Sequence, residues 1–443
     1  MAVSVITVFE YGYLSCEAED SRCSRVSAQA FDYLEILCLS QSEETPAFLR
    51  LCSWGGFKAL QVRNYVGVIH TPMDVQIEVL PKTSAADNES EQEARASLLN
   101  MLRHLHAFRN IETTDALVAT QKMSLLEVFV SQFLQSVNLL VKRGLRSEYI
   151  RREDNQTFMK GKLLPSQQLK HNLVNQHRFY VEYDEYLQNR PVNRLLHSAL
   201  IKVANYAHSN RNQKLCRELS FAFNNVPPSR NIKKDFAAMK LGRGMDYYKS
   251  PLAWARLILE GFSPLSMHGK ETTVSLLFPM EAVFESYVAS ILRRQLKPPF
   301  SLKEQASSKY LVDYGSNHWF RLKPDLLIMK GKQVVQVLDT KWKLLDSEKD
   351  NGKDKLGLSQ SDFYQMFAYG HKYCGGQGEM MLIYPRTEQF REAIQQSFDF
   401  SKSLKLWVVP FDIGGRTLES ERLRLPSLYS GPLRAQPEIA NEI

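Results

Sequence analysis

The feature that most constrains this chain is a pair of short apolar runs that carry one aspartate each around a tight turn. Residues 326–329 and 334–338 read as two strands, and residues 330–332 (Lys-Gly-Lys) read as the turn between them. Asp325 opens the first strand and Asp339 closes the second. Because paired strands lie about 5 Å apart, such a hairpin can bring the two carboxylates together.

A lysine extends this cluster. Lys341 follows Asp339 by two positions, so both side chains project to the same side of an extended strand. Two carboxylates suit a hard cation such as Mg²⁺, which polarises a phosphodiester and lowers the pKa of a bound water. The lysine would orient that water or offset charge on the phosphate. The alternative is a turn aspartate followed by a solvated strand end, but Asp339 closes an apolar run, where an unpaired carboxylate is costly.

Two expected helices flank the hairpin and carry further polar residues. The upstream helix begins near residue 280 and contains Glu285. The downstream helix, at residues 361–373, contains Gln365 and Tyr369, which share a helix face because they lie four positions apart. On residues alone, Glu285 can equally be an exposed helical carboxylate, and the second helix can simply pack through its aromatic residues.

These motifs together resemble a known family. Pro324-Asp325, thirteen intervening residues and then Asp339-Thr340-Lys341 resemble the PD-(D/E)XK nuclease signature, and nearly the whole chain is similar to McrC, the nuclease subunit of the McrBC modification-dependent restriction systems. The resemblance implies that Asp325 and Asp339 bind Mg²⁺ with help from Glu285, and that Lys341 acts on the transition state or the attacking water. It gives Gln365 and Tyr369 a role in supporting Lys341 or in contacting the phosphate backbone.

The pattern of elements predicts an α+β multidomain protein. Residues 1–83 are expected to form a β-rich domain, since residues 3–9, 60–69 and 75–80 have strand patterns. Residues 84–264 carry apolar residues at helical spacing, for example in a helix over 124–143 that stops at Gly144, and predict a mainly helical middle domain. Residues 265–443 are expected to form an α/β restriction-endonuclease-like domain of order α-β-β-β-α-β, with its first strand at 309–313.

The resemblance also implies partners. The amino-terminal domain, residues 1–83, would dock on a motor ring. No G-x-x-x-x-G-K-[ST] phosphate loop occurs in the chain, so translocation would need a separate NTPase. The family supplies an AAA+ GTPase ring of the McrB type, which usually carries methylcytosine recognition, and double-stranded DNA is the expected substrate.

Composition agrees with a DNA enzyme only mildly. The 443 residues carry a net charge of +8, which favours polyanions. The six cysteines show no metal-ligand spacing, and their scatter fits free thiols in the cytoplasm. Polar residues interrupt the most apolar segment, 125–141, so we expect no membrane span. The basic and aromatic segment 171–186 could contact DNA, although a mixed surface and core is favoured. The basic cluster of Arg230, Lys233 and Lys234 is interpreted as a solvated face, and His318 as structural.

Three functions follow as hypotheses. The first is a Mg²⁺-dependent endonuclease subunit that docks on a GTP-driven ring and cuts modified foreign DNA. The second is a stand-alone RecB-like nuclease, which would need little beyond residues 265–443. The third is a catalytically inert adaptor that stimulates the ring, and the complete set of Asp325, Asp339 and Lys341 argues against it.

Overall fold

The computed structural model describes residues 4–40, 47–71, 75–83, 90–105, 123–260, 275–349, 351, 353–414 and 419–434. The chain divides into two compact units, which are described separately. Residues 1–109 and 262–443 form unit 1, and residues 110–261 form unit 2. The amino- and carboxy-terminal segments therefore belong to one body, whereas the sequence predicted separate domains for them. The expected boundary at 264/265 lies outside the described residues.

The amino-terminal part of unit 1 contains two four-stranded sheets that share a core. One sheet has the order β1 (Ser4–Phe9), β7 (Val75–Leu80), β6 (Tyr65–His70) and β11 (Ser275–Pro279). The other has the order β3 (Cys23–Arg25), β2 (Tyr13–Ser15), β5 (Phe57–Val62) and β4 (Leu49–Trp54). Helix α1 (Ala28–Leu39) buries Phe31 and Leu34 against this core, and α2 (Glu91–Leu102) follows β7 in the chain.

Strand β11 ties the distant ends of the chain together. It pairs antiparallel with β6, and Leu277 lies opposite Gly67. Gly67 has φ +131°, and a Cβ there would collide with the carbonyl oxygen of Leu276, so this close approach requires glycine. In addition, the indole of Trp342 donates a 2.9 Å hydrogen bond to Glu10. The amino-terminal sheet is thus completed by a strand that precedes the predicted nuclease helix.

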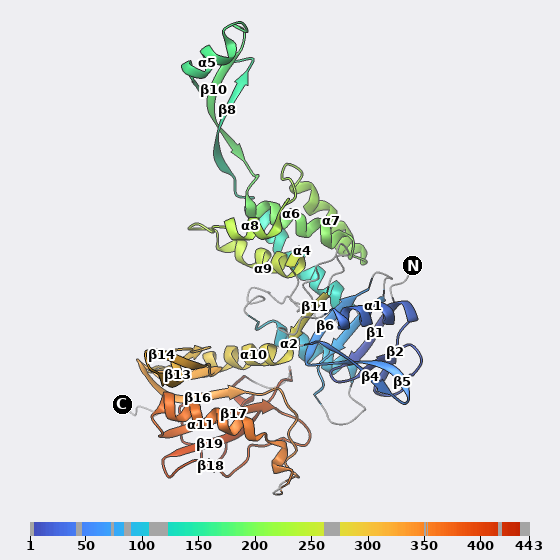
Figure 1. Cartoon of the computed structure of the whole chain (residues 1–443), viewed down its shortest axis with the longest axis vertical. Helices are drawn as coiled ribbons and strands as arrows, with labels where there is room; N and C mark the ends of the chain where they lie inside the picture. The colour runs from blue at the N-terminus through green and yellow to red at the C-terminus, as the bar shows by residue number, and fades with distance from the viewer. Residues whose placement is uncertain are drawn as a thin grey trace, which may run out of the picture. The chain divides into compact units, whose positions relative to one another are not determined.

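The carboxy-terminal part of unit 1 is built on a six-stranded sheet. After α10 (Met280–Gln295), the sheet has the order β12 (Phe300–Glu304), β15 (Leu326–Lys330), β16 (Gln333–Thr340), β17 (Gly378–Pro385), β19 (Leu404–Phe411) and β18 (Phe398–Asp399). Strands β15 and β16 are antiparallel, whereas β16, β17 and β19 run parallel. Helix α11 (Gln360–Cys374) covers one face and packs Met366, Tyr369 and Tyr373 into the core (Figure 1).

One strand of this domain was predicted in the wrong place. The sheet does follow the α-β-β-β-α-β order, but its first strand is β12. The segment predicted for that position is β13 (Lys309–Tyr314), which pairs only with β14 (Asn317–Leu322) in a separate two-stranded ribbon. All its residues except Tyr310 are exposed, and it pairs with no strand of the six-stranded sheet.

Unit 2 combines a helical core with a long β-hairpin. The helices are α4 (Leu125–Arg143), α6 (Pro191–Ala204), α7 (Asn210–Ala222), α8 (Ile232–Ala238) and α9 (Lys249–Glu260). The hairpin joins β8 (Glu148–Gln156) to β10 (Phe179–Leu187), with β9 (Lys162–Leu163) and α5 (Pro165–Asn172) at its tip (Figure 1). The expectation of a mainly helical region missed this hairpin, because charged residues run along both strands and hide the apolar alternation.

Helix α4 is the central helix of unit 2. The side chain of Ser124 caps its first turn. The helix ends at Gly144, where the sequence predicts the stop. Among the described residues it alone is long and apolar enough to cross a membrane by length and composition, although 61% of that window is buried inside the protein. Core helices pass the same test, and α4 packs on α6, α7 and α9.

Candidate active site

The β15–β16 hairpin brings the two predicted carboxylates together. Its register pairs Leu326 with Leu338, and the same register places Asp325 beside Asp339. Gly331 permits the turn because it adopts φ +62°, where glycine is not strained. Residues 326–328 and 336–338 beside them are buried, so the two carboxylates lie at the end of a rigid support.

Asp325 is held by the residue that follows the second aspartate. Its Oδ2 accepts hydrogen bonds from the backbone N–H and the hydroxyl of Thr340, each 2.7 Å long. Burial raises the pKa of Asp325, while the bonds from Thr340 and the charge of Lys341 lower it in part. Thr340 was not singled out from the sequence, although it occupies the variable position of the D-x-K motif.

Asp339 is the most deeply buried charge of the site. It is 1% exposed, and its Oδ2 lies 2.6 Å from Nζ of Lys341. Its Oδ1 is buried and accepts no hydrogen bond from the described residues. Burial, and then the charge of Asp325, raises the pKa of Asp339. A carboxylate that lacks half of its hydrogen bonds in an apolar surrounding is poised to receive a cation.

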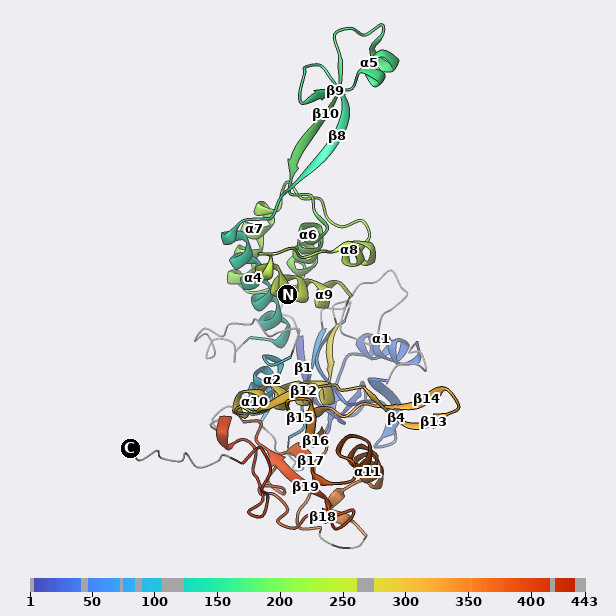
Figure 2. The same ribbon diagram turned by 90° about the vertical axis from the view of Figure 1, so that its left-hand side faces the viewer.

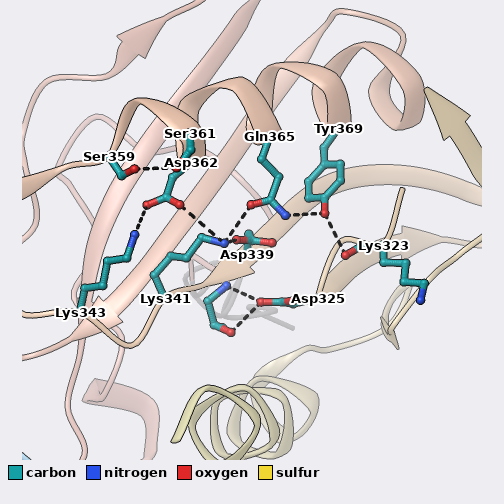
Figure 3. Close-up of polar contacts among 11 residues, drawn as sticks. Lys323, Asp325, Asp339, Lys341, Lys343, Ser359, Ser361, Asp362, Gln365 and Tyr369 are labelled. Carbon is teal, nitrogen blue, oxygen red and sulfur yellow. Dashed lines mark hydrogen bonds and ion pairs between the residues drawn. The ribbon is translucent and has the colours of Figure 1, made fainter. Parts of the chain in front are cut away.

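Lys341 lies between its own strand and helix α11 (Figure 3). Its Nζ contacts Asp339 and donates a 3.0 Å hydrogen bond to Oε1 of Gln365. Burial lowers the pKa of Lys341, but the carboxylates of Asp339, Asp325 and Asp362 together outweigh burial, and the net pKa is raised. The amine is therefore a cation fixed by partners on two elements.

Gln365 and Tyr369 form a chain of hydrogen bonds along α11. Gln365 Nε2 donates to the hydroxyl of Tyr369 over 2.7 Å, and that hydroxyl donates to the carbonyl oxygen of Lys323 over 2.9 Å (Figure 3). Burial raises the pKa of Tyr369 to about 12, so this hydroxyl stays protonated and can donate. Of the two roles expected for these residues, the contacts fit the support of Lys341.

Asp362 is a residue of the site that the sequence did not single out. It lies on α11 one turn before Gln365 and is buried. Its two oxygens lie 2.9 Å from Nζ of Lys343 and 4.0 Å from Nζ of Lys341 (Figure 3). Its spacing of three from Gln365 on one helix face is the signal that could have found it.

Glu285 approaches the same cluster from helix α10. Gln305 Nε2 lies 3.4 Å from its Oε1. Burial first, then the charges of Asp325 and Asp339, raises the pKa of Glu285 to about 7. The charges of Asp325 and Asp339 thus act on Glu285 across α10 and the hairpin, and the charge of Lys341 lowers the pKa of both aspartates.

The donor set fits a hard divalent cation held mainly by Asp325 and Asp339. The unpartnered Oδ1 of Asp339 and the raised pKa values of the carboxylates both indicate uncompensated negative charge. No group of three His, Cys, Asp or Glu side chains in the described part of the chain has the arrangement of a complete metal site. Mg²⁺ does not require one, because it keeps several waters and often uses one or two carboxylates.

Other candidates lie apart from this cluster. His318 is in the β13–β14 ribbon, 2.6 Å from Asp313, in keeping with a structural role. The segment 171–186 forms part of the hairpin of unit 2, where the His171 ring stacks on Tyr180 at 5.1 Å. The basic cluster near residue 230 lies at the start of α8, also in unit 2.

The comparisons with known proteins agree with these motifs. Residues 60–385 match the family described as "McrBC 5-methylcytosine restriction system component". No curated protein matches the chain at a significant level.

Among solved structures, the chain is similar to one from an assembly of Thermococcus gammatolerans McrB AAA+ hexamers with bound McrC. The two chains are 19% identical with a TM-score of 0.67, and the match covers 94% of this chain and 97% of that one. A cryo-EM structure of the Thermococcus gammatolerans McrBC complex matches over 66% of this chain and 88% of that chain, at 21% identity and a TM-score of 0.49. The family match spans most of the sequence, and the chain therefore belongs to the McrBC restriction system components, as its resemblance to McrC indicated.

Proposed function

We propose that this chain is the nuclease subunit of an McrBC-type restriction system, and that it cuts DNA with Mg²⁺ at the β15–β16 hairpin in a PD-(D/E)XK-type domain. The observation that carries the proposal is the buried pair Asp325 and Asp339 with Lys341 fixed beside it. A lysine held by a carboxylate and a helical glutamine at the end of a buried strand has no evident structural purpose. Structural roles for such groups are better filled by apolar residues.

Each residue has a task in phosphodiester hydrolysis. Asp325 and Asp339 would hold Mg²⁺, with Glu285 adding negative charge at the same point. When bound, the cation supplies Lewis-acid polarisation of the scissile phosphate and an activated water. Lys341 stays charged and would place its Nζ beside the phosphate oxygens, where charge grows in the transition state. Gln365 and Tyr369 keep that amine in place.

The partner is proposed to be an AAA+ GTPase ring of the McrB type. The similar Thermococcus gammatolerans assembly contains McrB AAA+ hexamers with bound McrC, and this chain has no phosphate loop of its own. We also propose that the complex acts in the cytoplasm on foreign DNA that contains methylcytosine. This ring-dependent endonuclease is preferred over the stand-alone nuclease, because the chain keeps a second compact unit that hydrolysis itself does not need.

The proposed docking role of residues 1–83 needs a test other than deletion. Deleting them would strip β6 from β11 and remove the Glu10 partner of Trp342, both within unit 1. The nuclease part would then lose activity for structural reasons. Exposed substitutions on β4 and β5, followed by measurement of ring binding, test the docking surface without this complication.

Plasmid cleavage tests the function most directly. Methylated and unmodified plasmids would be incubated with the chain, its AAA+ partner, GTP and Mg²⁺. Lys341→Ala should lower cleavage about 10²- to 10³-fold, because a fixed charge beside the reacting phosphate is lost. Lys332→Ala is the matched control, since this exposed lysine lies in the turn of the same hairpin, at the end away from Asp325 and Asp339.

Each hypothesis gives a different result in this assay. Ring- and GTP-dependent cutting that is lost in Lys341→Ala supports the proposal. Cutting by the chain alone would support the stand-alone nuclease. Stimulated GTP hydrolysis without any cutting would support the inert adaptor, and equal cutting by Lys341→Ala and wild type would show that the catalytic centre lies elsewhere.

A further inference from the structure

The β13–β14 ribbon exposes an unusual number of large apolar side chains. Trp319 is 46% exposed and Phe320 is 68% exposed. Others on the ribbon are exposed as well: Leu311, Val312 and Tyr314. Single exposed apolar residues are ordinary, but a contiguous group of them marks a binding surface. Figure 2 shows the two strands extending together from the body of unit 1.

Phe320 also has a strained backbone. Its φ is +57°, in the left-handed region that a bulky side chain rarely adopts. The strands pair Tyr310 with Arg321 and Val312 with Trp319, and Phe320 lies between these two pairs. Backbone strain of this kind is typical of functional sites. The ring of Phe320 is exposed to solvent, so its burial does not compensate for the strain.

The base of the ribbon is fixed to the candidate active site. Tyr373 on α11 donates a 3.1 Å hydrogen bond to the carbonyl oxygen of Leu322, and Tyr369 donates to that of Lys323. Tyr369 is also the partner of Gln365, which holds Lys341. One helix therefore sets both the ribbon and the catalytic lysine. The chain reaches Asp325 only three residues after the ribbon ends at Leu322.

The charges of this region are complementary to a polyanion. Residues 309–323 contain three cationic side chains, Lys309, Arg321 and Lys323, which are exposed. The same stretch contains one acidic residue, Asp313, and His318 contacts it. Arg321 lies over the Tyr310 ring and donates to the carbonyl oxygen of Ser307, so it is presented in a fixed position.

We propose that the β13–β14 ribbon is a DNA-contacting arm that lies in a groove of the duplex beside the cleaved phosphate. The inference rests on the nuclease function proposed above and adds a substrate-binding site to it. A two-stranded ribbon fits the major groove of B-form DNA, which is about 12 Å wide. Lys309 and Lys323 contact the phosphates, and the rings of Trp319 and Phe320 make apolar contacts with base edges and methyl groups in the groove.

Duplex binding by the full-length chain tests this arm. The measurement uses the Lys341→Ala background, so that binding is observed without cutting, and a fluorescent duplex with methylated cytosines as the probe. Trp319→Ala with Phe320→Ala should weaken binding about tenfold or more, because each lost ring removes apolar contact with base edges in the groove. Phe221→Ala is the matched control, since Phe221 is 82% exposed on α7 in unit 2.

The phosphate contacts have a separate signature. Lys309→Gln with Lys323→Gln should lower the slope of log Kd against log salt by roughly 1.8, since each contact releases counterions. Both lysines are exposed, so this pair of substitutions tests the arm even if the aromatic variant folds poorly.

Two results would overturn the inference while leaving the nuclease function intact. One is duplex affinity and salt slope unchanged in both variants. The other is unchanged duplex affinity together with loss of self-association or of ring binding, which would make the ribbon a protein-docking surface. If neither the chain nor its complex with the ring binds the duplex at all, the proposed function and the arm fail together.

Discussion

Two consecutive hairpins of unit 1 distribute their side chains in opposite ways. The β15–β16 hairpin buries a charge, since Asp339 is 1% exposed, whereas the β13–β14 ribbon exposes an aromatic ring, since Phe320 is 68% exposed. Both arrangements oppose the usual partition of polar and apolar groups. Only Lys323 to Asp325 separate the two hairpins in the chain. The difference indicates that the β15–β16 hairpin is suited to catalysis and the β13–β14 ribbon to binding.

The β15–β16 hairpin depends on helix α11, whose Gln365 holds Lys341. Among the predictions that test the contrast between the two hairpins, loss of this support should have the largest effect. Gln365→Leu removes the acceptor that holds Nζ of Lys341 at 3.0 Å. Cleavage should fall roughly 10- to 100-fold, as is typical when a residue that orients a functional group is lost. Gln360→Leu, on the same helix, is the control because Gln360 contacts Tyr364 and not the site.

A duplex-binding assay separates positioning from recognition in this variant. Duplex affinity should be unchanged in Gln365→Leu, since the ribbon and not the lysine is expected to carry the contact. If Gln365→Leu weakened binding as much as cleavage, the division of tasks between the two hairpins would be wrong.

The sequence predicts the β15–β16 hairpin far better than the β13–β14 ribbon. The apolar runs around residues 330–332 predict two strands, and the position of Asp339 at the end of one run indicates a buried carboxylate. The spacing of Gln365 and Tyr369 gives the helix face. These signals come from residues that are close together in the sequence, so periodicity and motif spacing are enough to detect them.

What the sequence did not predict depends on non-local pairing. Strand β11 pairs with β6 although about two hundred residues separate them in the chain, and no local sequence pattern predicts this pairing. The β13–β14 ribbon has the composition of a sheet strand, and only its place outside the six-stranded sheet makes its aromatics exposed. Likewise, Thr340 contacts Asp325 through the register of the β15–β16 hairpin, and Asp362 approaches Lys341 because α11 packs beside β16.

Burial of Glu285 on α10, together with the charges of Asp325 and Asp339, predicts a pH-dependent stability. The pKa of Glu285 is raised from 4.5 to about 7 in the folded chain, so the folded state binds this proton more tightly than the unfolded state. Its protonation stabilises the fold below about pH 4.5, and that contribution is lost as the pH rises through 7. Glu285→Gln should therefore match wild type at pH 5 and exceed it by about 1–2 kcal/mol at pH 8.

Thermal unfolding with and without Mg²⁺ tests this prediction and the metal site together. At pH 8, Mg²⁺ should raise the Tm of wild type more than that of Glu285→Gln, because the cation offsets the same repulsion. Glu281→Gln is a matched control on α10, with an exposed side chain. A Glu285→Gln chain less stable than wild type at every pH would mean that its bond with Gln305 outweighs the repulsion.

The smallest effect concerns the strain in the ribbon. Phe320→Gly removes a side chain that is mostly exposed and relieves a φ of +57°, so we expect a gain of about 0.5–1 kcal/mol in the free energy of unfolding. Phe57→Gly should lose about 1 kcal/mol, since Phe57 is not among the residues with positive φ. If Phe320→Gly is more stable than wild type yet binds DNA less tightly, the strained conformation of Phe320 serves DNA binding. If Phe320→Gly were destabilised like Phe57→Gly, the ring would contribute to the fold, and the contrast between the two hairpins would lose its basis.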